Sequence, residues 1–109
     1  MINWDDFEKI DMRVGTILSA TNFPKAKQPA YKLMIDFGDM GIKKSSAQIT
    51  KLYSREELAG KQVIAVVNFP PKQIADFISE CLVLGVYTES KEVALLQPGV
   101  PVGNGCKIG

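Results

Sequence analysis

The sequence has no histidine and only two cysteines, Cys81 and Cys106, among its 109 residues. Imidazole carries protons near neutral pH and activates serine and cysteine nucleophiles, and zinc is bound by sets of Cys and His. These absences exclude zinc chemistry, Ser-His-Asp catalysis and Cys-His catalysis. One possible pair of cysteines is no disulfide framework, so we expect a reducing, cytoplasmic location. We expect no metal and no cofactor.

Long hydrophobic runs are also missing, because the longest apolar stretch is Val63–Val67. A membrane-spanning helix needs roughly 20 apolar residues. The first eleven residues contain four acids and lack the apolar run of a secretory signal. We therefore expect neither membrane insertion nor export of the chain.

The chain has almost no net charge, since 13 Lys and Arg face 12 Asp and Glu, a balance of +1. The charges are nevertheless segregated along the chain. The segment 24–72 contains nine bases and four acids, and each flanking segment sums to −2. Such segregation can gather positive potential on one region of a neutral protein, where a polyanion would respond to it.

The hydrophobic fraction of 46%, in a chain of this length, predicts one folded domain over residues 1–109. Turn signals recur at short intervals, as in all-β folds. In 32–37 the apolar Leu33, Ile35 and Phe37 alternate with polar residues, which predicts a strand with one buried face. The expected strands are 13–20, 32–37, 42–50, 62–69, 80–87 and 93–96.

Two short helices are predicted from their capping residues. Asn3 precedes two aspartates at the start of one, and Ser54 with Glu57 forms a capping box for the other, between the third and fourth strands. This element order predicts a five-stranded Greek-key barrel, the OB-fold, with a short N-terminal helix and a C-terminal β extension. An SH3-like barrel or a small sandwich remains the alternative.

Three segments resemble the tRNA-binding domain family: Ile-Asp-Met-Arg-Val-Gly-Thr-Ile at 10–17, the acidic helical segment 54–61, and Val-Val-Asn-Phe-Pro-Pro-Lys at 66–72. Within it, Lys-Ser-Ser-Ala-Gln-Ile-Thr-Lys at 44–51 and Leu-Leu-Gln-Pro at 95–98 resemble the CsaA group, free-standing members described as export-related chaperones. The resemblance covers essentially the whole chain. It implies a homodimer of OB-folds that binds tRNA or structured RNA and, for the CsaA group, non-native polypeptides or preproteins.

The strand around 43–48 is oddly polar for a barrel and would lie on the face that OB-folds use for ligands. Lysines there supply charge for phosphates, and Ser and Gln supply adaptable hydrogen bonds. The alternative is a solvated face of the barrel. Asn68 and Lys72 lie beside the double proline at 70–71 and join this set. The expected contacts to RNA or another ligand are Lys43, Lys44, Ser45, Ser46, Gln48, Asn68 and Lys72.

A polypeptide ligand needs an apolar pocket, which we expect to be lined by Phe69, Phe77 and Ile78. A signal-peptide-like segment, apolar in its centre and basic at one end, is the expected guest. The alternative is that Phe69 belongs to the core. Where tRNA binders of the family tend to be basic or to have glycine, this chain has Gln73, Asp76 and Ile78. The resemblance therefore favours polypeptide over RNA as the stronger ligand.

A homodimer interface is predicted at the two ends of the chain. Trp4 and Phe7, three residues apart, share one face of a helix too short to be stable without packing. The alternative is that this helix folds back on its own barrel. The C-terminal segment contributes apolar residues that need cover, and the expected interface residues are Trp4, Phe7, Leu95, Val100 and Ile108.

The chain is expected not to be an enzyme. The remaining catalytic candidates are Asp36 and Asp39, two carboxylates that could hold Mg²⁺ at the end of a strand. No general base accompanies them. A binding protein is therefore the preferred interpretation of the sequence.

Overall fold

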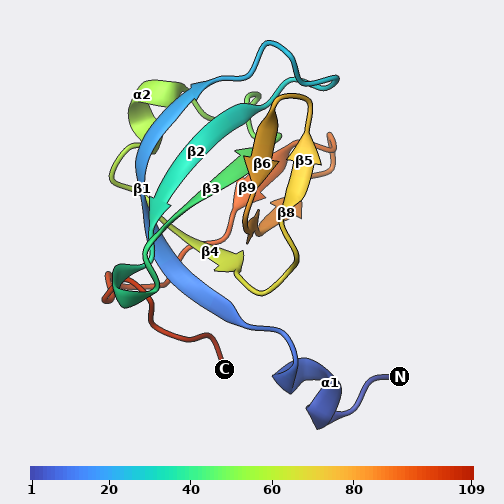
Figure 1. Ribbon diagram of the computed structural model, residues 1–109, viewed down its shortest axis with the longest axis vertical. Helices are drawn as coiled ribbons and strands as arrows, with labels where there is room; N and C mark the ends of the chain where they lie inside the picture. The colour runs from blue at the N-terminus through green and yellow to red at the C-terminus, as the bar shows by residue number, and fades with distance from the viewer.

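The computed structural model describes all 109 residues and shows an antiparallel sheet of five strands curled into a nearly closed barrel (Figure 1). The strands are β1 (Met12–Asn22), β2 (Tyr31–Asp36), β3 (Ile42–Ala47), β4 (Gln62–Val66) and β7 (Leu82–Val83). Their order across the sheet is β3-β2-β1-β4-β7. The predicted all-β OB-fold is confirmed.

The long strand β1 is shared by both halves of the barrel. It pairs with β4 through residues 12–16 and with β2 through residues 16–22. The register with β2 shifts between Ile17 and Ser19, and such a β-bulge bends the strand. A Cβ atom on Gly15 would lie 2.7 Å from the side chains of Ile35 and Phe37. The barrel therefore packs closely across β1 only because this residue has no side chain.

The core fills the barrel from the alternating strand faces. Leu33, Ile35 and Phe37 are fully buried, as their alternation predicted. Val63 and Ala65 of β4 pack against them in the same cluster. Each large apolar side chain buried in this way contributes roughly 1.5–3 kcal/mol to folding.

Both predicted helices are confirmed with their caps. Helix α1 (Trp4–Glu8) begins after Asn3, whose side chain accepts a hydrogen bond from the Asp6 amide. Helix α2 (Arg55–Leu58) has the Ser54 capping box and lies between β3 and β4, where it covers one side of the barrel (Figure 1). Its Leu58 is fully buried. Helix α1 instead stands away from the barrel at the other end of the molecule (Figure 1).

A two-stranded hairpin of β5 (Lys72–Ile74) and β6 (Phe77–Ser79) follows β4 and was not predicted. It lies beside β3 (Figure 1). The strand expected over 80–87 divides into β7 and β8 (Gly85–Tyr87), because the chain leaves β4 to pair with β9 (Val93–Leu95). Strand β9 is one residue shorter than expected. The C-terminal β extension expected at 106–108 is a single antiparallel bridge between Lys107 and Arg13.

The C-terminal segment runs back along β1 and places the two ends of the chain at the same end of the barrel (Figure 1). The Gly105 amide donates to the Val14 carbonyl at 2.7 Å, and the Ile108 amide donates to the Met12 carbonyl at 2.9 Å. Arg13 joins the same segments, since its guanidinium donates to Asp11 at 2.7 Å and to the Gly105 carbonyl at 3.1 Å. No helix of the structure is long and apolar enough to cross a membrane.

Candidate functional site

Phe69 lies at the surface directly after β4, with 54% of its area exposed, so it is not a core residue. A hollow of about 450 Å³ opens beside it. Its walls are mostly apolar, with Pro70, Ile74 and Leu82 among them. An exposed ring beside an apolar hollow offers an anchor for an apolar or aromatic ligand group.

A second hollow of about 560 Å³ adjoins the first and shares Ser46, Lys72 and Ile74 with it. Lys25, Lys27 and Lys72 line this second hollow, and no carboxylate does. Lys25 also contacts Asp76 at 3.2 Å, and this hydrogen bond lowers the pKa of the Asp76 carboxyl. The two hollows together are called the ligand groove below, with an apolar half at Phe69 and a cationic half at Lys27.

Alternate residues of β3 face opposite sides, so the polar strand contributes only part of its side chains to the groove. Ser46 lines both hollows, and Gln48 lines the cationic half. Ser45 is fully buried, and its hydroxyl donates to the Cys81 carbonyl at 3.0 Å. The structure therefore does not place Ser45 in the groove, because a core hydrogen bond already uses its hydroxyl. Lys43 alternates with Ser45 and likewise lines neither hollow.

Phe77 packs against the barrel instead of lining the pocket with Phe69. Its ring meets that of Phe23 edge to face, with 5.5 Å between centroids. The Lys44 and Lys32 ammonium groups each lie 5.4 Å from the centre of the Phe77 ring. The expected pocket is wrong in this respect, because Phe77 already has aromatic and cationic partners in its own chain.

Ile78 is also separated from Phe77. In the β5–β6 ladder Ile78 pairs with Gln73 and Phe77 pairs with Ile74, so the two neighbours point to opposite faces of the hairpin. Ile78 is exposed and lines neither half of the groove. The apolar partners of Phe69 are instead Ile74 and Leu82, which the sequence analysis missed because nothing in the sequence marks a hairpin after the double proline.

Asn68 binds the N-terminal segment, although it was expected to contact ligand. Its side-chain oxygen accepts from the Asp11 amide at 3.0 Å, and its side-chain nitrogen donates to the Lys9 carbonyl at 2.8 Å. Both ends of the amide are therefore used within the chain. Asn68 positions the connection between α1 and β1.

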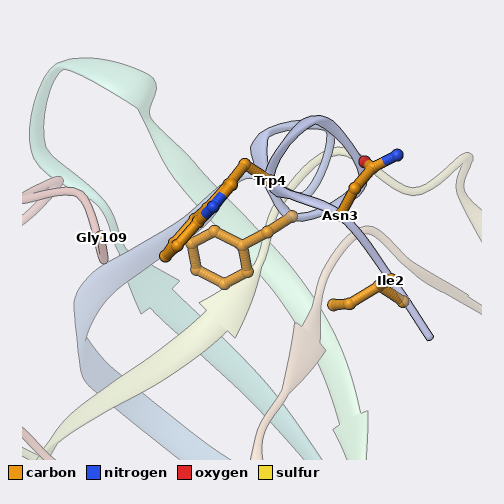
Figure 2. A pocket seen from close by; sticks show the side chains of 5 residues that line it. Ile2, Asn3, Trp4 and Gly109 are labelled. Atoms are coloured by element: carbon orange, nitrogen blue, oxygen red, sulfur yellow. The ribbon is translucent and has the colours of Figure 1, made fainter.

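The expected dimer residues divide into two groups. Trp4 is 85% exposed, and Figure 2 shows it on the same side of α1 as Ile2, beside a hollow of about 540 Å³ that also reaches Phe7 and Gly109. A neighbouring hollow of about 260 Å³ includes Phe7 and Ile108. The alternative in which this helix folds back on its own barrel is therefore wrong.

The other two expected dimer residues lie elsewhere. Val100 is exposed but lines neither hollow at α1. Leu95 lies on β9 and packs against the core of its own chain. The structure therefore does not bring either residue to the surface around Trp4.

Residues 12–107 match the family model described as "Putative tRNA binding domain". This chain belongs to the tRNA-binding domain family. The domain is also found in much longer relatives. The methionine–tRNA ligases of Nanoarchaeum equitans and Methanococcus aeolicus are 36% and 40% identical to it, over 99% and 95% of this chain. The chain spans only 14% and 15% of the length of those two proteins.

Among the solved structures that match this tRNA-binding domain over its whole length are two CsaA chaperones. The chaperone CsaA of Bacillus anthracis is 53% identical with a TM-score of 0.95, and each chain is covered to 99% or more. The CsaA chaperone protein of Picrophilus torridus is 56% identical with a TM-score of 0.94, and both chains are fully covered. The resemblance to CsaA found in the sequence is therefore confirmed.

The two cysteines of the tRNA-binding domain are both free, and Asp36, one of the two carboxylates considered for Mg²⁺, has a hydrogen bond within its own turn. Cys81 is buried and Cys106 is exposed. Burial raises the pKa of the Cys81 thiol from 9.0 to about 11, so it is protonated and unreactive near neutral pH. Asp36 accepts a hydrogen bond from the Gly38 amide at 2.8 Å and so stabilises the turn after β2.

Proposed function

We propose that this protein is a non-catalytic, cytoplasmic chaperone of the CsaA type, which binds non-native polypeptides, including preproteins, in the ligand groove. The proposal rests on Phe69, a half-exposed ring without an apolar partner ring in its own chain, beside a mostly apolar hollow. Such anchors typically dominate the binding energy of a protein surface. The full-length likeness to two chaperones named CsaA supports it, whereas the chain spans about a seventh of the methionine–tRNA ligases.

The charges of the groove restrict the class of polypeptide. Lys25, Lys27 and Lys72 line the half next to Phe69. A segment with apolar residues followed by acidic or polar residues suits this arrangement, because opposite charges favour association. The apolar centre of a signal-peptide-like segment fits the Phe69 half, but the lysines repel its basic end. This differs from the guest expected from the sequence.

Binding of tRNA or structured RNA is the second candidate. It is favoured by the same three lysines in the cationic half, which no carboxylate lines, and by the description of the matched family model. Lysines contact phosphates, and the Phe69 ring offers a surface on which a base can stack. The groove thus has features that suit either ligand. The salt dependence of the binding affinity distinguishes polypeptide binding from RNA binding.

The test measures the affinity of the protein for a permanently unfolded, reduced and alkylated polypeptide and for tRNA, each across a series of salt concentrations. We expect the polypeptide to bind more tightly at physiological salt and to respond weakly to salt, because apolar burial dominates. tRNA affinity falls steeply with salt through counterion release. Phe69→Ala should weaken polypeptide binding by roughly 1–3 kcal/mol with the fold unchanged. Lys72→Ala should reduce the salt slope for tRNA by about one.

Ser19→Ala, on the β1 strand, is a matched control, since Ser19 lines neither half of the groove. The chaperone proposal fails if tRNA outcompetes every unfolded polypeptide at physiological salt. It also fails if Phe69→Ala binds polypeptide as tightly as the natural sequence does.

We also propose that the protein is a homodimer that associates through the surface around Trp4 and Ile2. A soluble protein rarely leaves a tryptophan this exposed beside other apolar groups unless a partner covers it. Phe7 and Ile108 extend the same surface toward the C-terminal segment. A stable dimer buries on the order of 1,200–2,000 Å² in total.

A further inference from the structure

The seam that closes the barrel, between β3 and the segment 79–84, is hydrogen-bonded at one end only. At that end the Glu80 amide donates to the Lys44 carbonyl at 2.8 Å, and the Lys44 amide donates to the Glu80 side chain at 2.9 Å. The Ser45 hydroxyl donates to the Cys81 carbonyl at 3.0 Å, and the next backbone donor, the Ser46 amide, makes only a long contact to the Ser79 hydroxyl at 3.4 Å. Beyond it, the Gln48 amide and carbonyl have no hydrogen-bond partner in the chain.

This open end of the seam is a free strand edge. β3 is the outermost strand of the five, and its ladder is formed only with β2. Its even-numbered residues direct their backbone groups toward the seam, as the Lys44 and Ser46 bonds show. Gln48 continues this series. An unpaired edge of this kind is a template for an additional strand.

An apolar hollow of about 390 Å³, called the seam hollow below, lies against this free edge. Apolar side chains of the segment 82–87 and of β9 line it, including Leu82, Leu84 and Val93. No charged side chain lines it. The seam hollow adjoins the apolar half of the ligand groove, since Ser46 and Leu82 line both.

We infer that a non-native polypeptide binds in the seam as an extended strand, added to the edge of β3 at Ser46–Gln48. Every second side chain of the guest then enters the seam hollow, because strand side chains alternate between two faces. One end of the guest continues toward Phe69 through the wall that the two hollows share. The inference rests on the proposed function and states how its substrate is held.

The chemistry of the seam favours a polypeptide over RNA. Phosphates need cationic partners, and the seam hollow has none. Backbone hydrogen bonds to a strand edge are independent of the guest's sequence, while the apolar wall selects side chains only by hydrophobicity. This combination suits a chaperone, which must bind many sequences that share exposed apolar residues.

The first test scans the guest, so the protein keeps its natural sequence. The probe is a short fluorescein-labelled peptide with leucine at alternate positions and serine or glutamine between them. Each backbone amide is N-methylated in turn, and affinity is measured by fluorescence anisotropy. We expect affinity to fall about two- to tenfold at every second position and to change little between them, because only one edge of an added strand bonds to β3.

The second test changes the protein at one backbone donor. Gln48→Pro removes the amide that faces the seam and no bond within the fold, since that amide has no partner in the chain. Ala47, which precedes it, is already extended, as a residue before proline prefers. The matched Gln48→Ala also loses the side chain that lines the cationic half of the groove but keeps the backbone amide. Gln48→Pro should therefore bind peptide about two- to tenfold more weakly than Gln48→Ala.

The outcomes separate this inference from the proposed function. Peptide that binds with no alternation in the N-methyl scan overturns strand addition and leaves the chaperone proposal standing. Equal losses in Gln48→Ala and Gln48→Pro assign the contact to the side chain and also overturn it. If no unfolded polypeptide binds the natural protein, the proposed function fails, and this inference fails with it.

Discussion

Ser45 and Ser46 lie next to each other on β3 but face opposite sides of the barrel wall. The Ser45 hydroxyl is buried and donates to the Cys81 carbonyl, while Ser46 lines the ligand groove. A buried hydroxyl is stable there only because it has this partner. The bond also fastens β3 to the segment before β7 across the closing seam.

We predict that Ser45→Ala lowers the free energy of unfolding by about 1 kcal/mol and leaves polypeptide affinity unchanged. The substitution removes a buried hydrogen bond but nothing that a ligand can reach. Urea denaturation measures the free energy of unfolding and fluorescence anisotropy measures polypeptide affinity. Ser46→Ala is the matched control for stability only, because Ser46 lines the ligand groove. A binding loss without a stability loss would instead make Ser45 a ligand contact.

Cys81 makes stability dependent on pH in the alkaline range. Its folded-state pKa of about 11 exceeds 9.0, the value in an unfolded chain, so the folded state holds the thiol proton more tightly. This contribution to stability is complete below pH 9.0 and is lost as the pH rises toward about 11. We predict that Cys81→Ala shows a smaller decrease of unfolding free energy between pH 8.5 and 10.5 than the natural protein.

Urea titrations of both proteins across that range measure the difference, and other groups that titrate there cancel in the comparison. Identical pH dependence in the two proteins would contradict a buried, protonated thiol. A second readout at pH 8 is alkylation with iodoacetamide, which should label the exposed Cys106 and spare Cys81.

At the scale of elements, short segments are positioned by contacts that are distant in the sequence. Helix α1 has only five residues and contains no buried residue. Asn68, at the end of β4, binds the segment that joins this helix to β1 through the Lys9 carbonyl and the Asp11 amide. The orientation of α1 therefore depends on a residue 57 positions beyond Asp11.

We predict that Asn68→Ala destabilises the protein by about 1 kcal/mol and speeds hydrogen exchange of the Asp11 amide, because both hydrogen bonds are lost. Exchange measured by NMR separates this local effect from global unfolding. Asn22→Ala, at the exposed end of β1, is the control, since its side chain has no hydrogen bond in the structure. Unchanged exchange at Asp11 would show that Asn68 does not hold this segment.

At the scale of the whole molecule, the ligand surfaces and the Trp4 surface lie on different parts of the barrel. The groove and the seam involve β3 and the β5–β6 and β8–β9 pairs, whereas both chain ends lie near the start of β1 (Figure 1). In a dimer formed through α1, each protomer would therefore keep its own groove. Two grooves on one particle increase the apparent affinity for a long unfolded chain.

We predict that Trp4→Ala raises the dimer dissociation constant at least about 30-fold, as expected for the loss of a central aromatic contact worth 2 kcal/mol or more. Sedimentation velocity across a concentration series measures the equilibrium. Tyr87→Ala, which removes an aromatic side chain of similar exposure from β8, should leave it unchanged. A natural protein that sediments as a monomer at micromolar concentration would overturn the dimer proposal.

The barrel, its two capped helices and the buried face of residues 32–37 are determined by the sequence itself, because periodicity, caps and turn residues act over a few positions. The exposure of Phe69, the burial of Ser45 and the engagement of Asn68 depend on partners 36 to 59 residues away or on the path of the chain after Pro71. The hairpin that separates Phe77 from Ile78 is likewise a tertiary feature. Local signals therefore specify the strands, but only the closed barrel decides which polar side chains bond inside it and which remain free for a ligand.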